Sequence, residues 1–189
     1  MTERNQMLDT LRDVVARLND LGIEYMVTGS VAMSAYVPAR ATMDIDVIVE
    51  IERSEEYRFE KRFAGDYYVS IESIREARRR QSMFNMLNNL TGIKVDCIFR
   101  KPTQFETAKF GRRRRSKVGD IEFWVISKED LILSKLEWAR DSLSERQFDD
   151  VRNLLESGAD EEVIQNSIEN QGLRAVWEAF LEWKTRVEK

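Results

Sequence analysis

The stretch that decides the fold reads Tyr25-Met26-Val27-Thr28-Gly29-Ser30-Val31 and continues, after a gap, as Arg40-Ala41-Thr42-Met43-Asp44-Ile45-Asp46-Val47-Ile48-Val49. This pattern predicts a strand, a tight Gly-Ser turn, a short helix, a loop and a second strand that carries two acids. Strand side chains alternate between the faces of a sheet, so Asp44 and Asp46 are expected to share one face. Two adjacent carboxylates repel each other, and a cation between them explains their place at the head of an apolar strand. The alternative is a strand end with solvated acids.

A third acid stands in another predicted strand. Asp96 lies within residues 93–99, which pair with a predicted strand over 83–87. We expect Asp96 to converge with Asp44 and Asp46, although a surface acid on an edge strand is the alternative. Carboxylate oxygens suit a hard divalent cation such as Mg2+. Two such ions can hold the attacking and leaving oxygens of a phosphoryl transfer.

The turn at Gly29 and Ser30 opens the predicted short helix over residues 31–36. Helix N-termini offer free N–H groups to phosphate, and glycine lets the backbone approach a ligand closely. Ser30 also fits a helix cap, and a cap can contact phosphate as well. Together with the acids, these are the parts needed to hold a nucleoside triphosphate with its metal ions.

The composition excludes several kinds of chemistry. The chain has 189 residues, 42% hydrophobic and 34% charged, as expected for a soluble globular protein with one domain or one domain and an appendage. It contains no histidine, which excludes histidine metal ligands and every Ser-His or Cys-His pair. Cys97 is the only cysteine, so no internal disulfide forms and a cytoplasmic location is expected. We also expect no signal peptide and no membrane span.

The chain also shows a change of character along its length. Residues 1–126 mix predicted strands and helices, whereas residues 127–189 show only helical patterns, with capping signals at Ser127 and Ser144. We therefore predict an α+β core with a mixed sheet flanked by helices, followed by a C-terminal helical part. Residues 105–110 fit neither a strand nor a helix clearly. The four tryptophans are expected to pack in the core or between helices.

Two basic clusters interrupt a chain whose net charge is −4. Arg78–Arg80 fit the C-terminal end of a predicted helix, where cations suit the helix dipole. Arg112–Arg115 are predicted to form a solvated loop. The alternative is that this run contacts a nucleic-acid acceptor or a triphosphate.

The motifs resemble those of the nucleotidyltransferase superfamily of the DNA polymerase β type. That pattern has a hydrophobic segment with a Gly-Ser turn, then Asp-x-Asp, then a third acid between hydrophobic residues. The matching residues here are Thr28-Gly29-Ser30, Asp44-Ile45-Asp46 and Val95-Asp96-Cys97. Thr42, Lys135 and Asp150 are similar to positions in the AbiEii-type nucleotidyltransferase toxins of toxin–antitoxin systems. Gln147 departs from that subfamily, which commonly has an acid there.

The resemblance implies a role for each matched residue. Asp44, Asp46 and Asp96 would bind the metal ions, and Asp96 would also help to activate an acceptor hydroxyl. Ser30, with Gly29, would contact the phosphates, and Lys135 would neutralise triphosphate charge. Thr42 and Asp150 would complete the nucleotide site. The alternatives from the residues alone are a solvated lysine at 135, a helix-surface acid at 150, and a cap partnership of Gln147 with Ser144.

Two functions follow from these observations. The first is a magnesium-dependent, ATP-binding nucleotidyltransferase that transfers a nucleotide to a hydroxyl of RNA, a protein or a small molecule. The resemblance to the AbiEii-type toxins implies that this enzyme is a toxin with an antitoxin partner. The second is a catalytically silent relative that acts as a nucleotide-binding or antitoxin-like interaction module. The three acids favour the first function, and the departure at Gln147 favours the second.

Overall fold

The structure is a computed structural model that describes residues 3–38 and 42–188, so Arg40 and Ala41 of the opening motif lie outside the described residues. The chain divides into two compact units. The first runs to Ala35 and resumes after the loop to reach Ile126, and the second comprises Tyr36–Pro38 and the chain from Ser127 onward. None of the described helices is long and apolar enough to cross a membrane.

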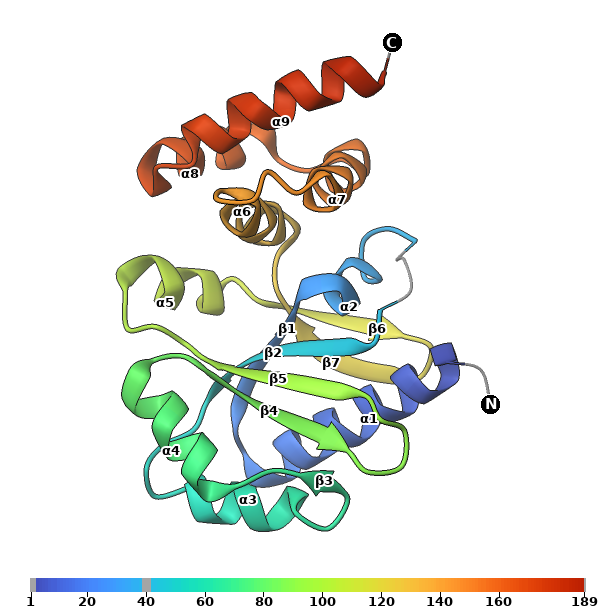
Figure 1. Cartoon of the computed structure of the whole chain (residues 1–189), viewed down its shortest axis with the longest axis vertical. Coiled ribbons are helices and arrows are strands. Elements are labelled where there is room, and N and C mark those ends of the chain that lie inside the picture. Colours follow the sequence, from blue (N-terminus) through green and yellow to red (C-terminus); the bar gives the residue numbers. More distant parts are fainter. Residues whose placement is uncertain (1–2, 39–41, 189) are drawn as a thin grey trace. The chain divides into compact units, whose positions relative to one another are not determined.

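The first unit is built on a seven-stranded mixed sheet (Figure 1). Its strands are β1 (Glu24–Thr28), β2 (Asp44–Glu50), β3 (Tyr67–Tyr68), β4 (Met83–Asn88), β5 (Lys94–Phe99), β6 (Arg114–Val118) and β7 (Ile121–Val125). They lie in the order β3-β4-β5-β2-β1-β7-β6, so β2 is the central strand. The pairs β2–β5 and β1–β7 are parallel, and the other neighbouring pairs are antiparallel. The prediction of a mixed sheet flanked by helices is confirmed.

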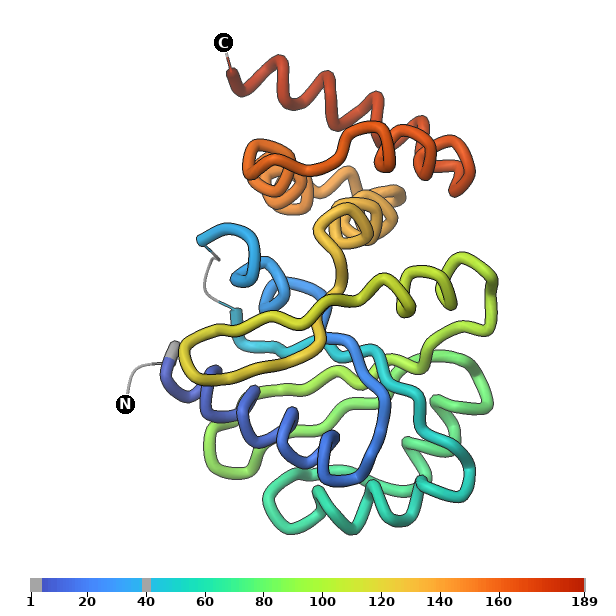
Figure 2. The backbone as a smooth tube through the Cα atoms, turned by 180° about the vertical axis from the view of Figure 1, so that it is seen from behind, coloured from blue at the N-terminus to red at the C-terminus, as the bar shows by residue number. Residues whose placement is uncertain are grey.

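Five helices lie among the described residues of the first unit. They are α1 (Glu3–Leu21), α2 (Gly29–Met33), α3 (Glu56–Phe63), α4 (Ile71–Arg80) and α5 (Gln104–Gly111). Figure 1 shows β4 and β5 in front of α1, and Figure 2 shows α1 in front of the sheet from the opposite side. The ring of Phe59 on α3 meets the ring of Phe84 on β4 edge-on, with centroids 5.6 Å apart. Phe84 is paired with Cys97, so the buried apolar residues face α3, and Asp96 points to the opposite face.

The second unit contains the helices α6 (Lys128–Ala139), α7 (Glu145–Glu156), α8 (Glu161–Gln171) and α9 (Arg174–Val187). The cap predicted at Ser127 is confirmed, because its Oγ accepts a hydrogen bond from the Asp130 N–H at 3.2 Å. Ser144 is the N-cap residue of α7, as predicted, but its side chain makes no capping hydrogen bond. The predicted partnership with Gln147 is wrong, because the Oε1 atom of Gln147 is buried without a partner among the described residues. The core prediction is also wrong for Trp138, which is 68% exposed.

The predicted loop is present only in the first half of the basic run, where Arg112 and Arg113 connect α5 to β6. Arg114 begins β6, the edge strand beside β7, and the preceding ambiguous segment forms α5, whose first turn is capped by Thr103. Arg113 lies with its guanidinium carbon 4.3 Å from the ring centroid of Phe110 and pairs with Glu24 at 2.8 Å. Arg114 and Arg115 are in register with Val125 and Trp124, so pairing with β7 places them in the sheet.

Candidate active site

The candidate site is a row of polar side chains that crosses four neighbouring strands. Asp46 on β2 is in register with Thr28 on β1 and with Asp96 on β5. Asp96 is in turn in register with Asn85 on β4. Residues in register point to the same face of a sheet, so Thr28, Asp46, Asp96 and Asn85 form one lateral row. The prediction that Asp96 lies on an internal strand rather than an edge agrees with its exposure of only 5%.

Gly29 lies directly against the Asp46 carboxylate. Its φ angle of +64° belongs to the left-handed region, which glycine adopts without a steric penalty. A Cβ atom at this position would lie 1.9 Å from Oδ2 of Asp46, far inside van der Waals contact. The junction where β1 passes directly into α2 is therefore packed against an acid of the site, and only glycine fits there. Ser30, the next residue, is buried at the start of α2.

Lys94 brings a positive charge among the acids. Its Nζ lies 2.8 Å from Oδ2 of Asp96, and it is in register with Asp44. The hydrogen bond with Asp96, and then the charges of Asp96, Asp44 and Asp46, raise the pKa of Lys94. An ammonium group thus balances part of the negative charge of the three carboxylates in this structure. The sequence analysis did not select Lys94, although its place two residues before Asp96 puts it on the same face.

Two further side chains hold the acids in place. Thr42 donates a hydrogen bond from Oγ1 to Oδ1 of Asp44, and Asn85 donates one from Nδ2 to Oδ1 of Asp96. Cys97, beside Asp96, is fully buried, and its burial raises the pKa of its thiol. Cys97 is therefore a neutral packing residue, as expected from the sequence, while Asn85 is a site residue that the sequence analysis missed.

The donor atoms of this site are carboxylate oxygens, which suit a hard divalent cation. The Lys94 ammonium lies beside them, so these carboxylates already stabilise a positive charge in this structure. Among residues 3–38 and 42–188, however, no group of three or more His, Cys, Asp or Glu side chains is arranged to hold a metal ion. Binding of such an ion by Asp44, Asp46 and Asp96 requires the carboxylates to draw together and the Lys94 ammonium to withdraw. The three acids as metal ligands stay a prediction.

Lys135 and Asp150 lie together in the second unit. The Nζ atom of Lys135 on α6 is 2.6 Å from Oδ2 of Asp150 on α7, and the two side chains are only 5% and 3% exposed. Neither is therefore a solvated surface residue. The role of Lys135 in binding a triphosphate, which the family resemblance implies, stays a prediction.

Comparisons with known proteins identify the fold. No protein-family model matches the sequence, and no curated protein does either. Among solved structures, the antibiotic-resistance enzyme ANT(2'')-Ia in complex with adenylyl-2''-tobramycin superposes with a TM-score of 0.61 at 12% identity, covering 90% of this chain and 98% of that chain. The lincomycin-bound lincosamide adenylyltransferase LnuA gives 0.52 at 13%, covering 79% and 94%.

A protein from Thermotoga maritima assigned as a nucleotidyltransferase gives a TM-score of 0.53 at 18% identity, covering 76% of this chain and 91% of that chain. These identities are low, so the likeness concerns the fold and leaves residue roles to the geometry. A particular closeness to the AbiEii-type toxins is not among these findings. The chain has the nucleotidyltransferase fold.

Proposed function

We propose that this protein is a magnesium-dependent nucleotidyltransferase that moves a nucleotide from a nucleoside triphosphate, such as ATP, to a hydroxyl group of an acceptor. The observation that carries the proposal is the in-register pair Asp46 and Asp96, with Gly29 packed against Asp46. The fold supports it, because two proteins that share it are named as acting on small antibiotics with an adenylyl group.

In the proposed reaction, Asp96 accepts the proton of the acceptor hydroxyl. The hydroxyl oxygen forms a bond to the α-phosphorus while the bond from that phosphorus to the bridging oxygen breaks, and pyrophosphate leaves with its electron pair. Asp44, Asp46 and Asp96 would hold magnesium, which when bound stabilises the charge that develops on the phosphoryl oxygens. Thr42 orients Asp44, and Asn85 orients Asp96.

The phosphates would lie at the turn formed by Gly29 and Ser30, beside Asp46. Lys135 would neutralise triphosphate charge, as the family resemblance implies. In the structure Lys135 is paired with Asp150, so this role requires the ammonium to be shared between Asp150 and a phosphate.

Gly29→Ala is expected to cost about 1–2 kcal/mol of stability, because alanine is strained at a positive φ angle. The new methyl group must also displace the Asp46 carboxylate, so we expect the rise in melting temperature caused by ATP and magnesium to disappear. Gly119→Ala is the matched control, since Gly119 has a φ of +63° and nothing lies within 4 Å of an added Cβ. It should lose similar stability and keep the full ligand-induced shift. An equal shift in both variants contradicts the proposed role of the Gly29 turn.

Lys94→Met should reveal the competition between the ammonium and magnesium. Without ligands, the melting temperature should fall, because the buried Asp96 loses its charge partner. Magnesium should then bind at about tenfold lower concentration, which corresponds to a gain of ~1.4 kcal/mol in binding free energy. This gain is smaller than the ~4 kcal/mol of repulsion between two like unit charges 4 Å apart near a protein surface, so loss of the ammonium charge is sufficient to produce it. A titration of the melting temperature with magnesium measures both effects, and the exposed Lys101→Met is the control. Unchanged magnesium dependence in Lys94→Met argues against a metal site among these acids.

The second candidate is a catalytically silent nucleotide-binding or antitoxin-like module. It is favoured by the Lys94 ammonium, which already neutralises part of the acid charge. The two functions are separated by incubating the protein with magnesium, α-labelled nucleoside triphosphates and acceptors that include total RNA, protein extract and small hydroxylated molecules. We expect label on one class of acceptor. A magnesium-dependent thermal shift without label on any acceptor would instead establish the silent module.

The resemblance to AbiEii-type toxins adds a finer prediction. Expression of the chain in a bacterial host is expected to arrest growth, and coexpression of a cognate antitoxin is expected to restore it. Asp96→Asn should remove the growth arrest if nucleotide transfer causes it. Normal growth at high expression of the wild-type chain would discard the toxin role and leave the transferase proposal intact.

A further inference from the structure

A groove borders the candidate active site on the side of β4. It lies between β4 and α4, and it has a volume of about 500 Å³, within the range of sites for small molecules. Tyr68, Met83, Asn85 and Leu87 line it from the sheet, and residues of α4, including Arg80, form the opposite wall. β3 pairs with β4 at Leu87 and Asn88. The groove extends along β4 from Leu87 back to Met83, at the start of the strand.

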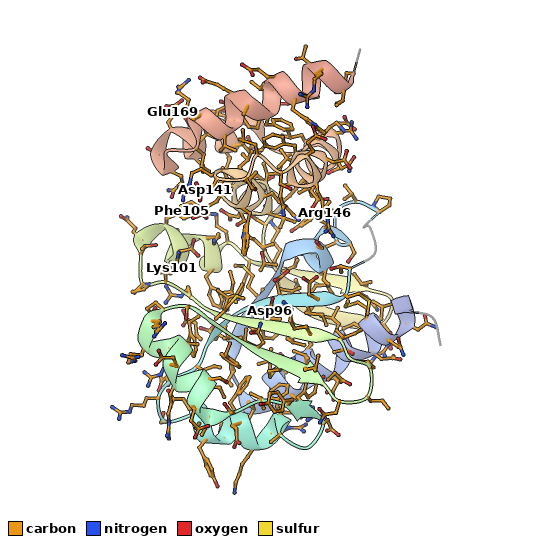
Figure 3. All side chains as sticks on the ribbon, viewed as in Figure 1. Asp96, Lys101, Phe105, Asp141, Arg146 and Glu169 are labelled. Atoms are coloured by element: carbon orange, nitrogen blue, oxygen red, sulfur yellow. The ribbon has the colours of Figure 1, made fainter. Side chains whose placement is uncertain are left out.

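Asn85 connects this groove to the acids. It lines the groove and also donates a hydrogen bond to Oδ1 of Asp96, the residue proposed to take the proton from the acceptor. Figure 3 labels Asp96 on the central part of the sheet. The lateral row therefore runs from Thr28, next to the Gly29 turn, through Asp46 and Asp96 to Asn85 at the groove. The groove and the proposed phosphate turn lie at opposite ends of the same row.

This order matches the geometry of nucleotide transfer. In phosphoryl transfer the attacking and leaving oxygens lie roughly in line on opposite sides of the phosphorus. If the triphosphate lies at Gly29, the attacking hydroxyl must approach from the side of Asp96 and Asn85. Resting on the proposed function, we propose that the groove between α4 and β4 binds the acceptor molecule and directs its hydroxyl toward Asp96.

The lining indicates a small hydroxylated molecule of low net charge with an apolar ring face. Tyr68 and Leu87 are cross-strand partners with exposed fractions of 76% and 44%, and they offer an apolar surface on which a ring can stack. The charged residues of the lining, Glu76 and Arg80, form an ion pair with each other, so they balance in charge. Such a lining gives no net attraction to a polyanion, and it disfavours RNA as the occupant. Free nucleosides and glycosides have the required size, hydroxyl groups and ring faces.

Direct binding to the full chain tests the groove without relying on catalysis. Saturation-transfer NMR with a panel of free nucleosides and methyl glycosides should identify molecules that bind the wild-type protein. Leu87→Trp, which fills the groove, should abolish their signals. Leu90→Trp is the matched control, because Leu90 is 92% exposed and does not line the groove, and it should keep them. Absence of binding to the wild type, or equal binding to Leu87→Trp, overturns the groove as a binding site.

Label transfer from α-labelled ATP with magnesium then tests the acceptor role. Tyr68→Ala should raise the KM for the bound molecule about tenfold, as expected from the loss of an aromatic contact, and leave kcat nearly unchanged. Tyr57→Ala, another exposed tyrosine outside the groove lining, should leave the KM unchanged. The melting-temperature shift produced by ATP and magnesium should be the same in both variants, because neither touches the proposed phosphate turn.

The outcomes separate this inference from the proposed function. If the wild type labels RNA, or labels a small molecule equally well after Leu87→Trp, the protein is a nucleotidyltransferase and the groove is not its acceptor site. If groove ligands bind but the wild type labels no acceptor at all, both the acceptor role and the proposed transferase activity are rejected. Labelling of a groove ligand by the wild type, lost in Leu87→Trp and kept in Leu90→Trp, supports both.

Discussion

Asp46→Asn is expected to lower the rate of nucleotide transfer by about 10³-fold or more, since loss of a metal ligand removes several kcal/mol of transition-state stabilisation. The substitution keeps the size of the side chain and removes its charge. Asp46 lies between Thr28 and Asp96 in the lateral row and against Gly29, so no other acid among residues 3–38 and 42–188 occupies this position. Label transfer from an α-labelled nucleoside triphosphate measures the effect.

The control for Asp46→Asn is Asp141→Asn, because the Asp141 side chain is 96% exposed and lies outside the candidate site. It should keep full activity. A melting curve shows whether the Asp46→Asn protein is folded, and removal of magnesium with a chelator should reduce the wild type to the same residual rate. Transfer by Asp46→Asn at the wild-type rate would exclude this acid from the reaction.

Lys135→Met is expected to cost about 3–5 kcal/mol of unfolding free energy, the usual effect of leaving one partner of a buried ion pair without its counterion. The Lys135 and Asp150 side chains are 2.6 Å apart and almost completely buried, so water cannot compensate the remaining carboxylate. Urea unfolding measures the change. Lys184→Met is the control, since its ion pair with Glu188 is half-exposed and 3.7 Å long, and it should cost less than about 1 kcal/mol.

A double variant distinguishes stability from function at this pair. Lys135→Met combined with Asp150→Leu should recover most of the lost stability, because an apolar pair can replace a buried ion pair. If Lys135 also neutralises the triphosphate, the recovered double variant should keep a raised KM for the nucleotide. A wild-type KM in the stable double variant would assign Lys135 to stability alone.

The strands that carry the acids were predictable because their signal is local. The apolar run after Asp44 and the alternation around Asp96 follow from burial on one or both faces of a sheet, and β2 and β5 have the predicted positions. The cap at Ser127 was predictable for the same reason, since cap and partner are three residues apart. At Ser144 the same pattern marks the residue before α7, but the side chain makes no capping hydrogen bond, so the pattern alone does not produce one.

The features that complete the site depend on contacts between distant segments. The register that pairs Asp46 with Asp96 joins residues 50 positions apart in the chain, and no local pattern encodes it. The same holds for Asn85, which reads as an ordinary polar strand residue until its bond to Asp96 is known. β6 differs, because its arginines have low strand preference and join the sheet through pairing with β7, the next strand along the chain.

The most direct test is a crystal structure of the protein with magnesium and a non-hydrolysable nucleoside triphosphate. The account predicts metal density about 2.0–2.1 Å from carboxylate oxygens of Asp46 and Asp96, with phosphate oxygens at the Gly29 turn and the Lys94 ammonium moved away from Asp96. A nucleotide bound elsewhere, with the contact between Lys94 and Asp96 intact and no metal between the acids, would contradict it.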